Sequence, residues 1–369
     1  MKQYRPSYYK NFRCIAGACS DSCCIGWEID IDDKSAAFYR SVGGDFGCRL
    51  RQNILQDENG SQFILRGERC PFLNEQNLCD IYIHLGESAL CEICDQHPRY
   101  HEWFGNWKES GVGLCCEAAG RLIFSQEAAT SFETVEISEE PGEAVDEEAF
   151  CSLFAARRRA IQLLQNRQLP FAQRLRLLLL YGEEVQEALD WEDWRRIREI
   201  ADAYACPEEG AEEILTDCSA LSPLLTFLSD LEPIDPQWPA LLLRIRDQFE
   251  EVLSAQQQYH ALRPQWPQDM EQLAVYFLFR YFCKALFDGD IASKTALTVS
   301  ACLLIALLNG ETVLRKGSFT LEDQVFTAKQ FSKEIEYCIE NLDALCDLLW
   351  EGRILSTTDL CALVSAIFA

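Results

Sequence analysis

The sequence lacks the usual features of an exported or membrane-spanning protein. Its first residues, MKQYRPSYYKNFRC, contain no apolar core of a signal peptide. The longest apolar runs are residues 297–308 and 273–279, and both are too short to cross a bilayer. We therefore expect a soluble, cytoplasmic protein without a membrane partner.

Positive charge is also scarce. The 369 residues include 33 Lys and Arg against 59 Asp and Glu, a net charge of −26. Residues 1–125 carry 13 basic and 17 acidic residues, a net −4, which leaves −22 for the remainder. Such a field repels a phosphate backbone, so we expect no nucleic-acid partner. It would attract a basic protein surface, although solubility alone is the simpler explanation.

Histidine is rare, whereas cysteine is abundant. The chain has 4 histidines and 19 cysteines, and eleven of the cysteines lie in the first 116 residues. The reducing cytoplasm argues against a disulfide framework. Metal binding explains the concentration of cysteines better than bridging does.

The early cysteines follow one another in short, loop-like segments. Cys14-x4-Cys19-x3-Cys23-Cys24 is followed by Cys70-Pro-Phe-Leu, Leu78-Cys79, Cys91-x2-Cys94 and Cys115-Cys116. Thiolates in short loops hold thiophilic ions or iron–sulfur clusters. More than four candidates exceed one tetrahedral zinc site. The spacing is compatible with one cluster and spare thiols, two clusters, or a cluster and a zinc ion.

The eight later cysteines have no metal-binding spacing. Cys338 and Cys361 fall on apolar helical stripes, where a free cysteine acts as a small buried hydrophobe. We expect the same of the other six, which are Cys151, Cys206, Cys218, Cys283, Cys302 and Cys346.

The chain divides into two parts of different composition. Residues 127–148 contain nine acidic residues, no basic residue, and the Pro141-Gly142 pair, as a surface connection would. We predict a mainly α protein: a small, cysteine-rich α+β metal-binding domain with short hairpins over 1–125, an acidic linker over 126–149, and a large all-α domain over 150–369.

Several local patterns are specific enough to test. Residues 63–67 and 99–110 are typical of strands, the latter with a Gly105-Asn106 turn. No long helical period precedes about residue 80. Apolar residues from Phe331 to Leu349 recur at steps of 4, 3, 4, 3 and 4, which predicts one long helix ending at Gly352. Thr320–Asp323 and Ser356–Asp359 are typical of capping boxes.

The ordered cysteine blocks resemble a known family. The resemblance covers about residues 4–125 and rests on these blocks: Cys14, Cys19, Cys23-Cys24-x-Gly-Trp-x-Ile-x-Ile-Asp, Cys70-Pro-Phe-Leu, Leu78-Cys79-x-Ile-Tyr, Cys94-x3-Pro98-Arg99, and Cys115-x-Glu117-Ala-Ala. They are similar to the flagellin lysine N-methylase family, within the wider group of zinc- or iron-chelating CxxCxxCC domains. The helical part carries a weaker signature, Tyr276-Phe-Leu-Phe-Arg280-Tyr-Phe.

The resemblance implies an S-adenosylmethionine-dependent lysine methylase with an iron–sulfur centre, of the 4Fe-4S type, that acts on flagellin or a similar surface protein. The ligands it implies are Cys14, Cys19, Cys23, Cys24, Cys70, Cys79, Cys94 and Cys115. Cys91 stands where the family tends to have a small hydroxyl residue, and Cys116 where it usually has proline. By resemblance neither is a ligand, nor is Cys48, although spacing alone favours the pair Cys91 and Cys94.

Two charged residues lie beside the implied ligands. Arg99 could bind a carboxylate, such as the methionyl end of the cofactor, neutralise a cluster, or pair with Glu117. Trp27 and Trp103 could stack on the cofactor, although core packing is the commoner role of a strand tryptophan. No catalytic base stands out among the tyrosines.

The sequence contains none of the familiar motifs for this cofactor. No glycine-rich turn follows a first strand; Gly111-Val-Gly113 is too short, and the C-x3-C-x2-C spacing of radical enzymes is absent. The alternatives are therefore a structural or interaction module holding zinc or an iron–sulfur cluster, and a redox sensor without methylase activity.

Overall fold

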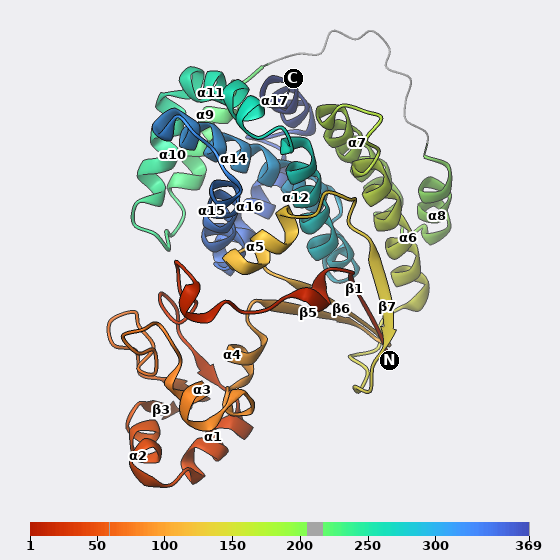
Figure 1. Cartoon of the computed structure of the whole chain (residues 1–369). Coiled ribbons are helices and arrows are strands. Elements are labelled where there is room, and N and C mark those ends of the chain that lie inside the picture. The colour runs from red at the N-terminus through yellow and green to blue at the C-terminus, as the bar shows by residue number, and fades with distance from the viewer. Residues whose placement is uncertain (59, 205–216, 369) are drawn as a thin grey trace.

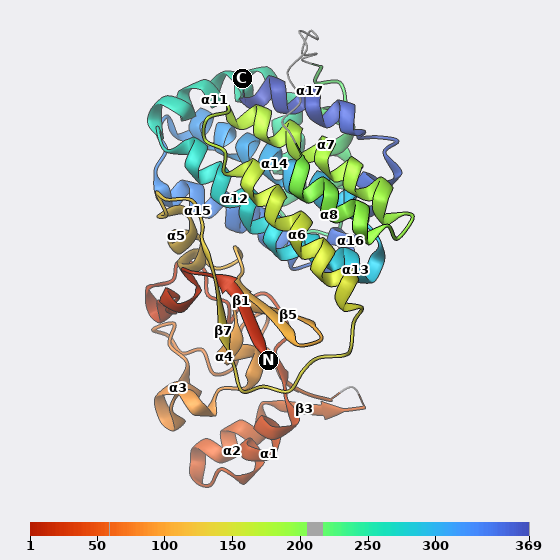
Figure 2. The same cartoon turned by 90° about the vertical axis from the view of Figure 1, so that its right-hand side faces the viewer.

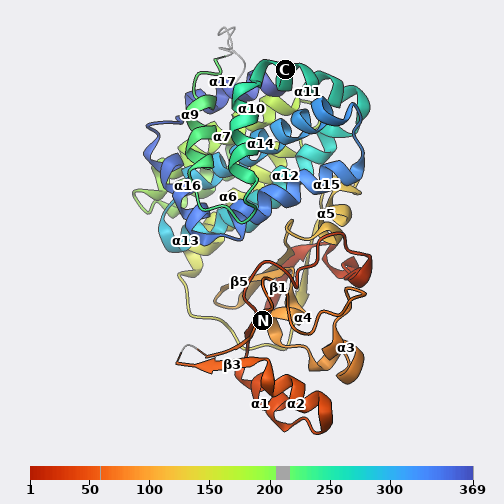
Figure 3. The ribbon, with the colours of Figure 1, turned by 90° about the vertical axis from the view of Figure 1, so that its left-hand side faces the viewer.

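Most of the chain is helical, in agreement with the predicted fold class. The computed structural model describes residues 1–58, 60–204 and 217–368 (Figure 1). Three layers follow one another along the long direction of the molecule: a small N-terminal lobe, a four-stranded sheet, and a large helical part (Figures 2 and 3).

The small lobe holds short helices and a three-stranded sheet. Its strands are β2 (Asp30–Ile31), β3 (Ile54–Asp57) and β4 (Gly60–Phe63), in the order β2-β4-β3. Its helices are α1 (Asp33–Ser41), α2 (Gly44–Gln52), α3 (Asp80–Leu85) and α4 (Glu92–Gln96). The sequence did not predict α1 and α2, because nine residues give too few turns for a clear period. The strand expected over 63–67 ends at Phe63.

The four-stranded sheet joins distant parts of the chain. Its order is β5 (Arg99–Phe104), β6 (Trp107–Val112), β1 (Lys2–Pro6) and β7 (Phe132–Glu136). β5 and β6 form the predicted hairpin, with Phe104 opposite Trp107 across the Gly105-Asn106 turn. β1 pairs parallel with β6 and antiparallel with β7. Part of the segment expected as a linker is therefore a strand of this sheet.

The helical part begins with α6. Helix α5 (Glu117–Phe124) precedes it, and the remaining helices are α6 (Glu147–Leu164), α7 (Phe171–Leu189), α8 (Trp194–Ala203), α9 (Leu221–Ser229), α10 (Trp238–Asp247), α11 (Phe249–Leu262), α12 (Trp266–Tyr281), α13 (Ala285–Asp288), α14 (Ala292–Lys316), α15 (Leu321–Phe331), α16 (Ile339–Glu351) and α17 (Thr357–Phe368). Among the described residues only α14 is long and apolar enough to cross a membrane, and 94% of its most apolar window is buried inside the protein. It packs against α7, α11, α12 and α15–α17 as a core helix does.

The predicted long helix over 331–349 is broken. α15 ends at Phe331, a π-helical turn spans Ser332–Glu336, and α16 starts at Ile339. The apolar period continues across the break, which is why the sequence hides it. Both capping boxes form, and Gly352 ends α16 with a left-handed φ of 62°.

Buried side chains form two cores that do not follow the predicted domain boundaries. The larger core unites the helices with β5, β6, α5 and the chain start. The smaller core draws only on residues between Ile29 and Cys91. The buried late cysteines are Cys283 and Cys302; Cys151 is exposed, Cys338 lies at the start of α16, and Cys206 lies outside the described residues. Cys218, Cys346 and Cys361 are half-buried and pack against the larger core, whereas Cys338 is half-buried without packing against it. Burial was therefore the wrong expectation for Cys151 and holds only in part for the half-buried cysteines.

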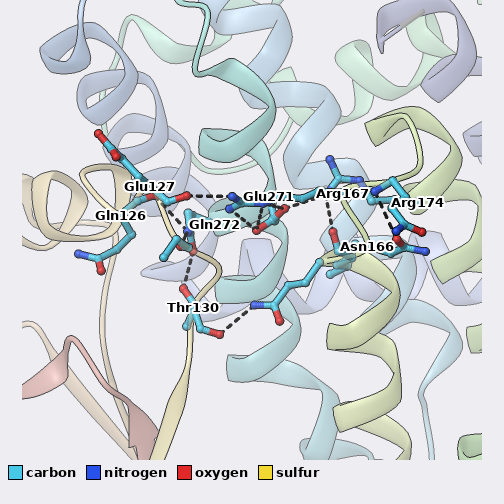
Figure 4. Close-up of polar contacts among 12 residues, drawn as sticks. Gln126, Glu127, Thr130, Asn166, Arg167, Arg174, Glu271 and Gln272 are labelled. Atoms are coloured by element: carbon cyan, nitrogen blue, oxygen red, sulfur yellow. Dashed lines mark hydrogen bonds and ion pairs between the residues drawn. The ribbon is translucent and has the colours of Figure 1, made fainter.

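A polar network fixes the chain after α5 to the helices (Figure 4). Gln272 donates to the carbonyl of Ala128 at 2.7 Å, and Arg167 donates to that of Glu127 at 2.9 Å. Glu271, with a side chain 1% exposed, pairs with Arg167 and with Arg174, each at 2.8 Å.

Glu271→Gln should lower the free energy of unfolding by about 3–5 kcal/mol, since it leaves the buried Arg174 without its counter-charge. Arg167→Gln is the matched control. It removes a 37% exposed partner of the same carboxylate and should cost about 1 kcal/mol or less. Urea denaturation measures both, and equal losses would contradict the assignment of the buried charge pair.

Candidate functional site

Five early cysteines gather around the smaller core. Cys70 and Cys91 are buried in it, and Cys24, Cys79 and Cys94 pack against it. The amide of Cys70 donates to the carbonyl of Cys24 at 2.9 Å. Cys91 precedes α4, which places Cys94 one turn later, where the two thiols share a hydrogen bond. This set is called the lobe thiols below.

The other early cysteines lie where the lobe meets the helical part. Cys14 and Cys116 are close enough to Cys23 to raise its pKa, and Cys14 and Cys19 act in the same way on Cys116. Cys115 is 6% exposed and lies next to Cys116. These five cysteines, Cys14, Cys19, Cys23, Cys115 and Cys116, are called the junction thiols.

Cys23 and Cys24 connect the two sets. A hydrogen bond between their neighbouring thiols, strengthened by burial, raises the pKa of Cys23, and the same bond lowers that of Cys24 to about 7. The bond between Cys91 and Cys94 likewise lowers the pKa of Cys91 and raises that of Cys94. In each pair one thiol is therefore poised to ionise first.

The donor set suits a thiophilic ion, although no metal shell is assembled. Among the described residues, no three His, Cys, Asp or Glu side chains converge closely enough to hold a metal ion. Four of the thiols instead form two hydrogen-bonded pairs, Cys23 with Cys24 and Cys91 with Cys94, which the loss of protons would convert into ligands. His97 lies 3.9 Å from the Cys115 sulfur, and burial lowers its pKa to about 4, so its imidazole is neutral at pH 7.

The predicted ligands divide between the two sets. Cys24, Cys70, Cys79 and Cys94 are lobe thiols, whereas Cys14, Cys19, Cys23 and Cys115 are junction thiols. Cys91 and Cys116, which the resemblance sets aside, each lie in one of the sets. Cys48 is exposed on α2, where Arg51 donates to its sulfur at 3.5 Å.

Arg99 and Glu117 do not form the pair considered from the sequence. Arg99 lies over the ring of Phe12 at 5.0 Å and donates to the carbonyl of Asp95 at 3.3 Å. None of the described carboxylates forms an ion pair with it.

Glu117 pairs with Arg121 at 3.5 Å instead, and its Oε2 accepts hydrogen bonds from the amide and hydroxyl of Ser20. Its side chain is buried, and its Oε1 has no hydrogen-bond partner among the described residues. This Oε1 is the atom that pairs with Arg121, and it can still accept a hydrogen bond from a ligand beside the junction thiols.

A carboxylate that sequence reasoning missed organises the junction. Glu336 ends the π-helical turn, and its Oε1 accepts from Tyr276 at 3.0 Å, Arg280 at 2.9 Å and Tyr281 at 2.9 Å. Burial raises the pKa of both tyrosines well above the ordinary value, so they donate as neutral phenols. The motif around Tyr276 and Arg280 was the only sequence signal for this network.

Tyr337 connects the Glu336 network with the junction thiols. Its hydroxyl shares a hydrogen bond with the Cys115 thiol, and its ring lies 5.8 Å from that of Trp27. A Cβ at Gly113 would come within 2.2 Å of the Tyr337 hydroxyl. The glycine therefore serves close packing between the lobe side and the helices, rather than a cofactor turn.

The cysteine loop is also bound to the helices by charge. Asp21 pairs with Lys329 at 3.2 Å and Lys333 at 3.1 Å, and the Lys329 side chain is only 6% exposed. Burial by itself would raise the pKa of Asp21, but the two lysines outweigh it and hold that pKa below the usual value. Asp21 therefore stays ionised and holds Cys19 and Cys23 against α15 and the π-helical turn.

Comparisons with known proteins give this arrangement a family. The FliB lysine N-methylase C-terminal domain matches residues 157–363, more than half of the chain. The flagellar biosynthetic protein FliU of Salmonella muenchen is 31% identical over an alignment of 134 residues, and the match covers 33% of this chain and 78% of that protein.

Two proteins named lysine-N-methylase, from Salmonella choleraesuis and Salmonella typhimurium, are each 30% identical over 134 residues. The match spans about a third of their length, 33% in both cases. No solved structure matches the chain. On the domain match and the FliU similarity, the chain belongs to the FliB lysine N-methylase family.

Proposed function

We propose that the protein transfers methyl groups from S-adenosylmethionine to lysine side chains of flagellin or a similar surface protein, with an iron–sulfur centre held by the N-terminal cysteines. Family membership carries the methylase assignment. The location in the cytoplasm and the two cofactors are part of the proposal. They rest on the resemblance and on the donor chemistry of the thiols.

The junction supplies one of the conditions that such a transfer demands of the protein, a closely packed surrounding. The lysine ammonium must lose a proton, its nitrogen must align with the methyl group, and water must be kept away. The cofactor, when bound, supplies a methyl group on a positively charged sulfur. The close packing of Tyr337 on Gly113 and the buried Glu336 network make the neighbourhood of Cys115 dry and rigid.

Arg99 and Glu117 suit the amino-acid end of the cofactor. The guanidinium of Arg99 can hold a carboxylate. The Oε1 of Glu117 pairs with Arg121 but accepts no hydrogen bond from a described residue, and it can accept one from an ammonium. They come from adjoining elements, since Arg99 lies opposite Val112 in the β5–β6 hairpin and Glu117 begins the helix that follows β6.

The thiols suit one or two metal centres. The lobe thiols and the junction thiols each number enough for four-thiolate ligation, as an iron–sulfur cluster or a structural zinc requires. We favour iron–sulfur because the resemblance implies it, since four thiolates by themselves suit a zinc ion equally well. Zinc in the lobe, or a zinc- or cluster-binding module or redox sensor without methylase activity, is the competing assignment.

Protein purified without oxygen should be brown and contain iron and acid-labile sulfide. Thiolate-bound iron–sulfur clusters absorb visible light, whereas zinc thiolates do not. Metal and sulfide analysis with an absorption spectrum provides the measurement. Stoichiometric zinc without sulfide would refute the iron–sulfur centre and favour the structural module.

Single serine variants should separate the two sets of thiols. Cys94→Ser removes a lobe thiol and Cys23→Ser a junction thiol, and each should lose the metal of its own set because the loss of one thiolate opens the shell. Elemental analysis of both variants gives the number of metal centres. If there are two centres, each variant should lose part of its metal, and if there is one, at least one variant should lose all of it. Cys338→Ser changes a cysteine that belongs to neither set, and as the control it should keep full metal content.

The anaerobic protein, given S-adenosylmethionine and purified flagellin, should add methyl groups to surface lysines. Mass spectrometry would detect each as an increase of one methylene. Arg99→Ala should weaken cofactor binding at least tenfold, about 1.4 kcal/mol or more, by removing a charge-assisted pair. Arg13→Ala is the matched control, because Arg13 is an exposed arginine next to Phe12, the residue on which Arg99 lies.

Iron content separates two roles of Arg99. Unchanged iron with weaker cofactor binding supports cofactor recognition, and loss of iron would instead mean that the arginine supports the metal centre. The methylase proposal is wrong if the metal-loaded protein neither binds the cofactor nor modifies lysine on flagellin.

A further inference from the structure

A cavity of about 730 Å³ opens at the far end of β5 from the junction thiols. It lies where the tip of the β5–β6 hairpin meets the start of α6, the α7–α8 connection and α13 (Figure 2). Its lining includes three aromatic side chains, Trp103, Trp194 and Phe287, and three carboxylates, Glu143, Asp146 and Glu192, with no basic residue.

The acidic segment before α6 forms one wall. The amide of Gly142 donates to the carbonyl of Gly105 at 3.0 Å, which ties this segment to the hairpin turn. A Cβ at Gly142 would come within 2.6 Å of the Cβ of Trp103, so only glycine fits there. The linker predicted from the sequence is therefore packed on the hairpin and turns Glu143 toward the cavity.

Aromatic rings with free surface line the cavity. Phe287 stacks on the buried Phe104 at 5.4 Å with an interplanar angle of 8°, and yet it is 58% exposed. Trp103 is 39% exposed even though Lys108 lies over its ring at 4.9 Å. Rings held rigidly by their buried neighbours and left open to solvent can receive the aliphatic stem and cationic head of a long side chain.

Two carboxylates at this cavity have no counter-charge. Neither Glu143 nor Glu192 forms an ion pair with another described residue. Glu192 also has a left-handed φ of 51°, a backbone conformation that is unfavourable for a residue with a side chain. Two backbone hydrogen bonds hold Glu192 in this conformation. Its own amide donates to the carbonyl of Leu189 at 2.8 Å, and the amide of Asp193 donates to that of Ala188 at 2.9 Å.

We propose that this cavity docks a lysine-bearing segment of the protein substrate, with the ammonium near Glu143 and Glu192 and the aliphatic stem on Phe287 and Trp103. The inference rests on the proposed function and concerns substrate recognition. Charge complementarity selects the occupant. The lining has three carboxylates and no basic residue, and the adjacent Lys108 is already paired with Glu139, so a cationic segment is favoured over an acidic or purely apolar one.

The docked lysine is not the one that reacts. Trp103 and Arg99 are four residues apart on β5, about 13 Å at the rise of an extended strand. A substrate chain laid along the hairpin would therefore place another lysine, about four residues away, beside the junction thiols. The cavity should raise affinity and select lysine-rich segments without taking part in the methyl transfer.

The test combines binding and turnover with purified flagellin. The double variant Glu143→Gln/Glu192→Gln should raise the Kd of flagellin about three- to tenfold in cofactor-free titration calorimetry, as expected for two exposed ion pairs. It should raise KM by a similar factor and leave kcat unchanged. A short peptide with a single lysine, which cannot occupy both places, should be turned over at the unaltered rate.

Two further variants distinguish binding at this cavity from a general effect of surface charge. Glu250→Gln/Glu251→Gln removes two carboxylates from a different surface cavity and should change nothing. Phe287→Ala should weaken binding without altering net charge. Unchanged Kd and KM in both Glu143→Gln/Glu192→Gln and Phe287→Ala would overturn the docking proposal. If flagellin is never methylated but its binding is weakened as expected, the docking surface stands and the proposed chemistry fails.

Discussion

The junction depends on one buried carboxylate. Burying the charge of Glu336 is expensive unless an opposite charge and several donors accompany it. Arg280 and two phenols meet that requirement within 3.0 Å. The π-helical turn is what brings Glu336 to them, because an uninterrupted α-helix would rotate this carboxylate away. Such single turns recur at functional sites, and here the turn also sets Tyr337 against Cys115.

The small lobe poses a separate stability problem. Its core holds few large side chains, and two of its twelve buried residues are the cysteines Cys70 and Cys91. A core of this size rarely folds stably without a covalent or metal crosslink. The lobe thiols lie where such a crosslink would act, around the same core. Metal binding there would therefore stabilise the fold of the lobe in addition to any chemistry at the junction.

The sequence predicted what depends on local patterns. The β5–β6 hairpin follows from Gly105-Asn106. The start of α15, the end of α16 and the start of α17 follow from Thr320, Gly352 and Ser356, because turns and caps are set by adjacent residues. The site was predicted only as a set of cysteines. Their division into two sets depends on chain paths between residues 24 and 91 that no local pattern encodes.

Other features were hidden for a different reason. Glu336 lies in a segment whose apolar residues keep an unbroken helical period. The hydrophobic pattern of the sequence therefore does not indicate its buried network with Arg280. The supposed linker has the composition of a solvated segment, yet Phe132–Glu136 joins the sheet and Gly142 packs on Trp103. Acidic composition and strand pairing do not exclude each other when only one face of an edge strand is covered.

An enzyme that modifies folded proteins has to recognise more than the reacting side chain, because surface lysines are chemically alike. The hairpin offers a physical solution. One end lies beside Cys115 and Glu117, where the chemistry is proposed, and the other forms the acidic, aromatic cavity. Since the two strands are joined by continuous backbone hydrogen bonds, the distance between the ends is fixed. A rigid spacing of this kind would select pairs of lysines by their separation along the substrate rather than by the residues around each of them. Substrate specificity would then depend on the same sheet that joins the lobe to the helices.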